Sequence, residues 1–248
     1  MLKKLKILYA TNDNDMIHDN RFLIKFIEHG HEVHYVSFIR REIKESEKIK
    51  GINYYNLPVS KKSYVDRYPL YRYPIRYFKC LMFLKEIIRK VQPNILHAGF
   101  VQISGVISSL SNYKPLLIMP FGHDILKYKE LPFYLRFLTR YAINKADYIS
   151  VDAEFVKDKV VEFFDFPKSK ISVFPWGVDR KVFSPVQDLS LRSKYNWEKN
   201  KVIIMNRGFQ PRMDVKTFIN AIPDIVSVNP DARFLLLGAS NLDVEDSL

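Results

Sequence analysis

Residues 201–240 read KVIIMNRGFQPRMDVKTFINAIPDIVSVNPDARFLLLGAS and alternate strand-like and helix-like patterns. The short apolar run Val202–Met205 is typical of a strand that is buried on both faces. Apolar residues then recur three or four positions apart over 215–226, as they do on the buried side of a helix. After a proline-containing break, Phe234–Gly238 forms a second apolar run. The stretch therefore predicts a βαβ unit with parallel strands and a right-handed crossover.

The chain before this unit repeats the same alternation. Seven strand-like runs separated by helix-like segments precede residue 180, and they predict one complete doubly wound α/β domain. The first helix should be capped by Asp19 or Asn20 and should end at Gly30. We expect strands over 5–10, 33–38, 52–57, 93–99, 115–120, 147–151 and 171–174.

The domain boundaries follow from this order of elements. Residues 1–183 are predicted to form an amino-terminal Rossmann-like domain. Residues 184–200 lack strong periodicity, which is typical of a linker. The segment 184–248 is too short for a second complete domain of this type. We expect it to hold the linker and the first βαβ unit of an incomplete carboxy-terminal domain, which would make the chain a truncated one.

Composition limits the class of protein. The 248 residues are 47% hydrophobic, which excludes a disordered chain. Cys80 is the single cysteine, so an intrachain disulfide and a cysteine zinc cluster are excluded, and no histidine–carboxylate cluster has the spacing of metal ligands. No apolar run reaches the roughly 18 residues needed to span a bilayer. We expect a cytoplasmic protein without a structural metal, either soluble or peripheral at the inner face of the membrane.

The net charge of +12 suggests a polyanionic neighbour, and most of this charge lies in one segment. Residues 61–90 hold nine Lys or Arg against two acids, with tyrosines and phenylalanines interleaved. This pattern favours binding to an anionic membrane surface. The alternative is an ordinary surface helix from near Pro74, since residues 77, 81, 84, 88 and 91 form one apolar stripe. No nucleic-acid motif accompanies the charge, so we predict no nucleic-acid partner.

The loop Asn12–His18 follows the first predicted strand. Open α/β sheets bind ligands at the carboxyl ends of their strands, so this loop is a candidate ligand site. It contains no G-x-G-x-x-G pattern, so a dinucleotide site is not indicated. A plain surface loop is the alternative.

Six motifs follow one another along the chain. Each is weak alone, but in this order they cover nearly the whole chain. They are GHEV at 30–33, NILHA at 94–98, FGHD at 121–124, VFPWGVD at 173–179, the turn that contains Arg207, and DARFLLLG at 231–238. With them the chain resembles a family 4 glycosyltransferase of the GT-B fold, in which two Rossmann-like domains face each other across a cleft.

The resemblance implies a retaining enzyme that moves a sugar from a nucleotide-diphosphate sugar to a glycan or lipid-linked acceptor. In such enzymes the amino-terminal domain mostly holds the acceptor, and neither a metal nor a covalent cofactor is used. Arg207 occupies the position of the family's diphosphate-binding arginine. Arg212 stands where a lysine is usual, and Gly122 would let the donor approach the backbone.

The same resemblance indicates residues near the reacting sugar. His123 is a candidate catalytic residue, because Phe121 stands where the family most often has histidine. Phe121 and Asp124 are candidate sugar contacts, although Asp124 could instead cap the next turn. His18 and His97 are candidate acceptor-side groups, since both are expected at the carboxyl ends of strands. For each histidine and arginine, the alternative is an ordinary surface side chain.

One feature of the family is missing. The paired-glutamate signature that holds the donor's sugar and ribose has no match in the sequence. We therefore expect the 248 residues alone to be inactive or nearly so. Two further functions stay open. One is a non-catalytic acceptor-binding or membrane-docking domain, and the other is a nucleotide-sugar epimerase, which shares the GT-B fold.

Overall fold

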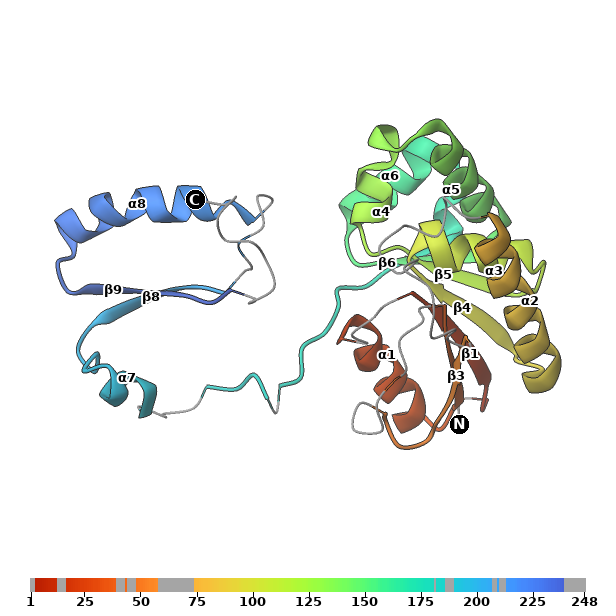
Figure 1. Ribbon diagram of the computed structural model, residues 1–248, viewed down its shortest axis with the longest axis horizontal. Helices are drawn as coiled ribbons and strands as arrows, with labels where there is room; N and C mark the ends of the chain where they lie inside the picture. Colours follow the sequence, from red (N-terminus) through yellow and green to blue (C-terminus); the bar gives the residue numbers. More distant parts are fainter. Residues whose placement is uncertain are drawn as a thin grey trace. The chain divides into compact units, whose positions relative to one another are not determined.

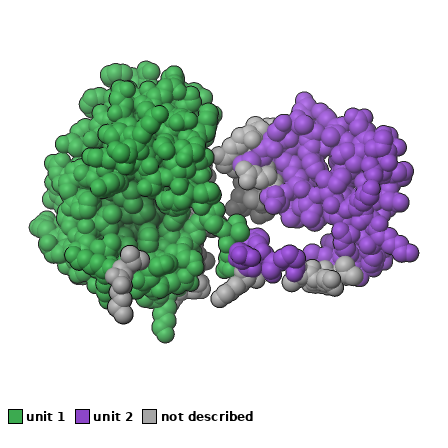
Figure 2. All heavy atoms as spheres, turned by 180° about the vertical axis from the view of Figure 1, so that it is seen from behind, with its two compact units in different colours: residues 1–179 green, residues 180–248 purple. Residues whose placement is uncertain are grey.

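The chain consists of two compact units, residues 1–179 and 180–248 (Figure 2). This division lies four residues before the predicted boundary at 183, and the roles predicted for the two parts stay predictions. The computed structural model describes the backbone at 17, 18 and 74–76, and backbone and side chains at 3–12, 19–38, 43, 48–57, 77–180, 182–185, 190–206, 209 and 213–238.

Unit 1 is built on a seven-stranded parallel sheet (Figure 1). The strand order β3-β2-β1-β4-β5-β6-β7 is a doubly wound topology, so the predicted α/β class and all seven predicted strands are confirmed. The strands are β1 Lys6–Thr11, β2 Glu32–Ser37, β3 Ile52–Asn56, β4 Ile95–Gly99, β5 Leu116–Met119, β6 Tyr148–Val151 and β7 Ile171–Val173.

Helices cover both faces of this sheet (Figure 1). Tyr9 of β1 lies in a small core under α1, whereas its neighbours Leu8 and Ala10 lie in a larger core on the other face. Helices α2, α3, α5 and α6 contribute to the larger core. The helices are α1 Ile17–Glu28, α2 Pro74–Val91, α3 Val106–Leu110, α4 His123–Leu126, α5 Phe133–Lys145 and α6 Glu154–Phe164, with 3₁₀ turns η5 Tyr128–Glu130 and η6 Lys168–Lys170.

The start of α1 differs from the prediction, and its end does not. The helix already begins before Asp19 and Asn20, so neither residue is its cap. Asp19 is instead fully buried, and its carboxylate accepts hydrogen bonds from the hydroxyls of Tyr9 (2.7 Å) and Tyr35 (3.1 Å). At the other end, Gly30 has a φ of +82° and closes the helix, as predicted.

Helix α2 confirms the helix predicted from near Pro74. Its apolar stripe belongs to the larger core, as the ordinary-helix interpretation expected. The residues of the stripe are Tyr77, Leu81, Leu84, Ile88 and Val91. The basic residues at 61–73 lie outside the described residues, so the structure does not test a docking role for this segment.

Unit 2 contains the predicted βαβ unit. Strands β8 (Lys201–Met205) and β9 (Ala232–Leu236) pair in parallel, and helix α8 (Val215–Val228) connects them. The helix packs on the strands through the rings of Phe218 and Phe234, whose centroids lie 6.1 Å apart.

Part of the predicted linker 184–200 is helical. Ser190–Lys194 form the short helix α7. The guanidinium of Arg192 donates hydrogen bonds to the carbonyls of Trp197 (3.1 Å) and Asn200 (2.8 Å). These bonds fold the segment back on itself, an effect that an apolar periodicity does not reveal.

Candidate functional site

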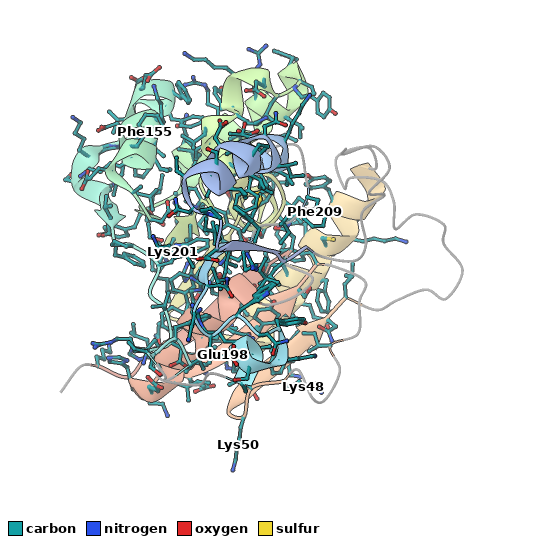
Figure 3. All side chains as sticks on the ribbon, turned by 90° about the vertical axis from the view of Figure 1, so that its left-hand side faces the viewer. Lys48, Lys50, Phe155, Glu198, Lys201 and Phe209 are labelled. Carbon is teal, nitrogen blue, oxygen red and sulfur yellow. The ribbon has the colours of Figure 1, made fainter. Side chains whose placement is uncertain are left out.

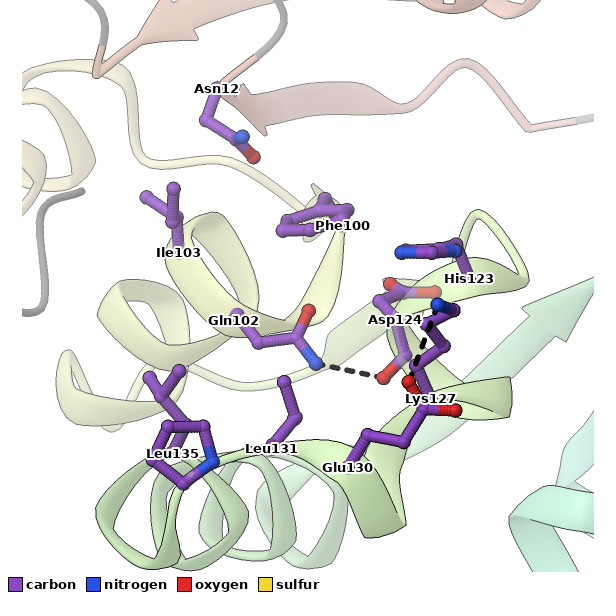
Figure 4. A pocket seen from close by; sticks show the side chains of 11 residues that line it. Asn12, Phe100, Gln102, Ile103, His123, Asp124, Lys127, Glu130, Leu131 and Leu135 are labelled. Carbon is purple, nitrogen blue, oxygen red and sulfur yellow. Dashed lines mark hydrogen bonds and ion pairs between the residues drawn. The ribbon is translucent and has the colours of Figure 1, made fainter. Parts of the chain in front are cut away.

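A pocket of about 500 Å³ opens at the carboxyl edge of the sheet in unit 1 (Figure 4). This is the edge at which open α/β sheets bind ligands. In Figure 4 the ionisable side chains gather on one side of the pocket and the aliphatic ones on the other. The lining residues are Asn12, Phe100, Gln102, Ile103, His123, Asp124, Lys127, Glu130, Leu131, Pro132 and Leu135.

The segment after β4 forms one wall of the pocket. Phe100 has a φ of 68°, which is uncommon for a residue with a side chain. A π-helical turn, η4 (Val101–Gly105), follows it, and such turns often occur at functional sites. The hydroxyl of Ser104 lies 3.1 Å from Oδ1 of Asn12 and also bonds the carbonyl of Gly99. The ends of β1 and β4 are thereby joined, and Asn12 of the predicted ligand loop reaches the pocket.

Gly122 turns the chain between β5 and α4. Its φ is +92°, a conformation that favours glycine. Its carbonyl accepts hydrogen bonds from the N–H groups of Ile125 (3.0 Å) and Leu126 (2.9 Å). The backbone therefore needs glycine here for its own geometry, and the predicted contact between Gly122 and the donor stays a prediction.

Asp124 fastens the two loops of the pocket together. Its Oδ1 accepts the N–H of Phe121 (3.0 Å) and its Oδ2 accepts the N–H of Val101 (3.0 Å). The side chain is 3% exposed, and this burial raises its pKa to about 6 in spite of these hydrogen bonds. Asp124 therefore binds backbone N–H groups, as the capping interpretation expected. It does not hold the cap position of α4, which belongs to Gly122.

Gln102 is a pocket residue that the sequence analysis did not single out. Its Nε2 donates to the carbonyl of Asp124 (2.8 Å), while its Oε1 is buried without a hydrogen-bond partner among the described residues. Buried polar atoms are usually bonded, so an orphaned amide oxygen at a pocket is a candidate ligand group. In Figure 4 this oxygen points between Phe100 and Asp124, inside the ring of lining side chains.

Three side chains form the exposed polar side of the pocket. His123 is the first residue of α4, and Figure 4 shows it above Asp124 at the rim. Lys127 and Glu130 form an ion pair of 3.3 Å. Exposed pairs of this kind contribute little to stability, so both charges stay available to a ligand. The structure thus brings the predicted catalytic residue His123 into one pocket with Asp124.

Phe121 packs in an aromatic cluster and does not line the pocket. Its ring centroid lies 5.3 Å from that of Trp176 and 6.1 Å from that of Phe100. Arg21 lies over the ring of Trp176 at 5.3 Å and donates to the carbonyl of Gly177 (3.3 Å). The cluster therefore joins two of the sequence motifs, FGHD and VFPWGVD. The sugar contact predicted for Phe121 stays a prediction.

His97 lies in the small core under α1. It is 4% exposed, and its ring packs against those of Tyr9 (4.7 Å) and Phe26 (6.0 Å). Burial lowers its pKa to about 3, so the ring is neutral at neutral pH. His97 lies two residues before the end of β4 at Gly99, where the predicted strand 93–99 also ends. His97 does not line the pocket, and its acceptor role stays a prediction.

Three of the predicted site residues fall where the structure describes no side chain. Arg207 and Arg212 lie outside the described residues, and so does the side chain of His18. Phe209, from the same turn as the arginines, is described (Figure 3). Its ring lies so close to Gly238 that a Cβ added there would overlap it. The position of the Phe209 ring thus depends on glycine at 238.

Residues 6–153 match the glycosyl transferase 4-like family. The chain belongs to this family. Sucrose-phosphate synthase from Thermosynechococcus elongatus has a similar fold, with a TM-score of 0.75 and 16% identity over 95% of this chain and 63% of that chain. Anabaena HepE in complex with UDP-glucose has a TM-score of 0.69 and 14% identity, and the match covers 98% of this chain and 63% of HepE. The UDP-GlcNAc 2-epimerase from Neisseria meningitidis bound to UDP-GlcNAc has a TM-score of 0.66 and 14% identity, and the match covers 98% of this chain and 67% of the epimerase.

These likenesses confirm the α/β fold of GT-B type that the sequence predicted for this glycosyl transferase 4-like chain. The chain spans a little less than two thirds of the first two of these proteins, at 63% of each. No curated protein matches it in sequence. Within the described ranges, no three His, Cys, Asp or Glu side chains are grouped as metal ligands would be. None of the helices described is long and apolar enough to cross a membrane.

Proposed function

We propose that the chain is the acceptor-side and partial donor-side region of a retaining glycosyltransferase. The enzyme would move a sugar from a nucleotide-diphosphate sugar to a glycan or lipid-linked acceptor. The observation that carries this proposal is the pocket at the carboxyl edge of the family domain. It is lined by His123 and by Gln102, whose buried Oε1 has no hydrogen-bond partner in the described part of the chain. The complexes of HepE with UDP-glucose and of the Neisseria epimerase with UDP-GlcNAc support a nucleotide sugar as donor.

The two sides of the pocket suit an amphipathic acceptor. The aliphatic side, with Ile103, Leu131 and Leu135, would take the less polar part of the acceptor. On the polar side, Oε1 of Gln102 would accept a hydrogen bond from a sugar hydroxyl, and His123 would contact the reacting sugar. Because Phe121, Asp124 and His97 are engaged in packing or with backbone N–H groups, we assign them roles in supporting the pocket.

The leaving diphosphate needs cationic or N–H partners as its charge develops. We assign this role to Arg207 and Arg212, since a guanidinium can bind phosphate oxygens through two parallel hydrogen bonds. Gly122 would leave room for the donor. His18 follows the first strand closely in sequence and is assigned to the acceptor side. For the chain alone we expect weak turnover, because the described part of unit 2 offers only a two-stranded sheet with helices α7 and α8.

Substitution of His123 tests the proposed reaction. The assay incubates the chain with UDP-glucose or UDP-GlcNAc and n-octyl glucoside, and follows UDP release and the anomeric proton signals by NMR. We expect a transferred sugar with its original anomeric configuration. His123→Ala should lower the rate about tenfold or more, because a hydrogen-bonding contact with the reacting sugar is lost. His29→Ala, which removes an exposed histidine at the end of α1, should leave the rate unchanged.

The NMR signals also separate the alternative functions. An epimerase, the alternative that similarity to the Neisseria enzyme favours, would convert UDP-GlcNAc to its C2-inverted isomer without releasing UDP. A binding domain would broaden or shift ligand signals without turnover. Either pattern, obtained without any transferred sugar, would contradict transferase activity.

As part of the same proposal, the basic segment 61–90 would contact the anionic inner face of the membrane. Liposome binding should weaken on charge reversal at Arg72, Arg76 and Lys79 together, at unchanged folding. Unchanged binding would remove this segment from the proposal.

A substitution at Gly238 tests the role of the turn that contains the two arginines, because Gly238 contacts Phe209 of that turn. Gly238→Ala should push the ring of Phe209 from its place and destabilise unit 2 by about 1–3 kcal/mol, as overpacking usually does. If Arg207 binds the diphosphate, the affinity for UDP measured by calorimetry should fall as well. Gly177→Ala is the matched control, because nothing lies within 4 Å of a Cβ at that position. If the unaltered chain, Gly238→Ala and Gly177→Ala bound UDP with equal affinity, this would argue against donor binding by the turn.

A further inference from the structure

Helix α5 presents aromatic rings outward from unit 1. Its inner side is buried and consists of Leu135, Thr139, Ala142 and Ile143. On its outer side Phe133 is 77% exposed, Phe137 is 63% exposed and Tyr134 is 44% exposed. Phe133 and Phe137 lie one turn apart, so their rings occupy the same side of the helix. Single exposed apolar residues are common on protein surfaces, but three aromatic rings in the first five residues of one helix form a patch.

The same helix carries positive charge without a counter-charge. It contains Arg136, Arg140 and Lys145 and no acid, and none of the three forms an ion pair with the described part of the chain. The longer stretch 126–145 has five cations against one carboxylate, a net charge of +4, and one of these cations, Lys129, is paired with Glu162 of α6 (3.4 Å). Arg140 is held in place at the helix surface, since it donates to the carbonyl of Phe163 (2.6 Å).

Helix α6 provides a contrast within the same unit. It also has a strongly exposed phenylalanine, Phe155, at 61% (Figure 3). However, α6 contains two lysines and three acids, and both of its lysines are paired with its own glutamates. Exposed aromatic surface coincides with unpaired positive charge on α5 and not on α6.

The start of α5 also adjoins the pocket. Leu131 and Pro132, just before the helix, and Leu135 in its first turn line the aliphatic side of the pocket. Phe133 and Tyr134 lie between these lining residues in sequence and are exposed. The aromatic patch therefore begins at the edge of the pocket, on the side where its lining is aliphatic.

We propose that this surface, defined as Phe133, Tyr134, Arg136, Phe137 and Arg140 and called the α5 face, docks on an anionic lipid bilayer. The rings would enter the boundary between headgroups and acyl chains, where aromatic side chains are favoured, and the guanidinium groups would bind lipid phosphates. A second copy of the chain is a poorer partner, because it would bring two sets of unpaired cations together. The α5 face is separate in sequence from the basic segment 61–90, and its docking does not depend on sugar transfer.

Vesicle flotation tests the α5 face without donor or acceptor. The full chain is mixed with vesicles of phosphatidylcholine, either pure or with about one third phosphatidylglycerol, at low and high salt. We expect binding to the anionic vesicles that weakens with salt. Phe133→Ser with Phe137→Ser should weaken binding at least about tenfold, because two interfacial rings are lost. Arg136→Glu should weaken it by about tenfold, since a charge is reversed next to the lipid phosphates.

Two matched variants control for exposed area and net charge. Phe155→Ser removes an equally exposed ring from α6, and Lys199→Glu reverses an exposed charge in unit 2. Both should bind vesicles as the unaltered chain does. Circular dichroism of each variant checks that the fold is kept, as expected for changes at exposed positions.

Three outcomes would overturn the proposal. One is vesicle binding that responds equally to Phe155→Ser and to the α5 changes. Another is binding that responds only to charge reversal in the segment 61–90. The third is self-association or single-stranded DNA binding that depends on Phe133 and Phe137 while vesicles are not bound. Because no sugar is transferred in this assay, its failure would leave the proposed glycosyltransferase activity untouched.

Discussion

Acidification is expected to destabilise unit 1 through His97. In the folded chain, burial lowers the pKa of this imidazole to about 3, whereas a histidine in an unfolded chain titrates near 6.5. Between these pH values the unfolded chain binds a proton that the folded chain does not, so the free energy of unfolding falls as the pH falls. The loss is about 1.4 kcal/mol per pH unit, which gives about 3 kcal/mol between pH 6.5 and 4.5.

The variant His97→Phe isolates this effect. Phenylalanine keeps a flat ring among Tyr9 and Phe26 and removes the titrating group. It also removes Nε2, which has no hydrogen-bond partner among the described residues, so the change should cost little at pH 7.5. Urea unfolding of both proteins at about pH 7.5 and 4.5 should show a relative shift of about 3 kcal/mol in favour of the variant.

The comparison between two proteins matters because other groups titrate in the same range. Asp124 has a raised pKa and acts in the opposite direction, but it contributes equally to both proteins. An NMR titration gives the pKa of His97 directly. A value near 6.5 in the folded chain, or a stability difference that is the same at both pH values, would contradict this explanation.

The strands could be predicted because a parallel sheet buried on both faces requires continuous apolar runs, such as Leu116–Met119 in β5. The start of α1 could not be predicted in the same way. Cap prediction uses neighbours in sequence, whereas the partners of Asp19 are the hydroxyls of Tyr9 and Tyr35 on two strands. Tertiary contacts therefore decided the role of this carboxylate.

The candidate site could be predicted only where its residues follow a strand end in sequence. His123 and Gly122 follow a strand end directly, so their place at the carboxyl edge could be read from the sequence. His97 was assigned to that edge, but side chains alternate along a strand, and its position in β4 directs it under α1. Gln102 was missed because its burial depends on a π-helical turn and on Asp124, 22 residues further along the chain.

Removal of the Asp124 carboxylate is expected to open the pocket wall. In Asp124→Ala the buried N–H of Val101 and the part-buried N–H of Phe121 lose their acceptor, and a buried unpaired N–H costs about 1–3 kcal/mol. Loss of a buried charge offsets part of this cost, so we expect a net destabilisation of about 2–4 kcal/mol at pH 7.5. Asp158→Ala, at an exposed position on α6, should change stability by less than about 0.5 kcal/mol.

Asp124→Asn separates the charge from the hydrogen bonds. The amide keeps one acceptor oxygen but turns an NH₂ group toward the other backbone N–H, so its loss of stability should lie between those of the unaltered chain and Asp124→Ala. The folded chain keeps the Asp124 proton up to a pKa of about 6, whereas the unfolded chain releases it near 3.8. The unaltered chain should therefore lose about 3 kcal/mol relative to the Asn variant as the pH rises from about 4 to 6.

This pH dependence has the opposite sign to that of His97, so the two residues can be told apart in one set of unfolding curves. If the Asn variant and the unaltered chain changed in parallel with pH, Asp124 would not be titrating as a buried acid. If Asp124→Ala were as stable as Asp158→Ala, the carboxylate would not be what joins the ends of β4 and β5. The pocket beside Gln102 would then need another explanation for its shape.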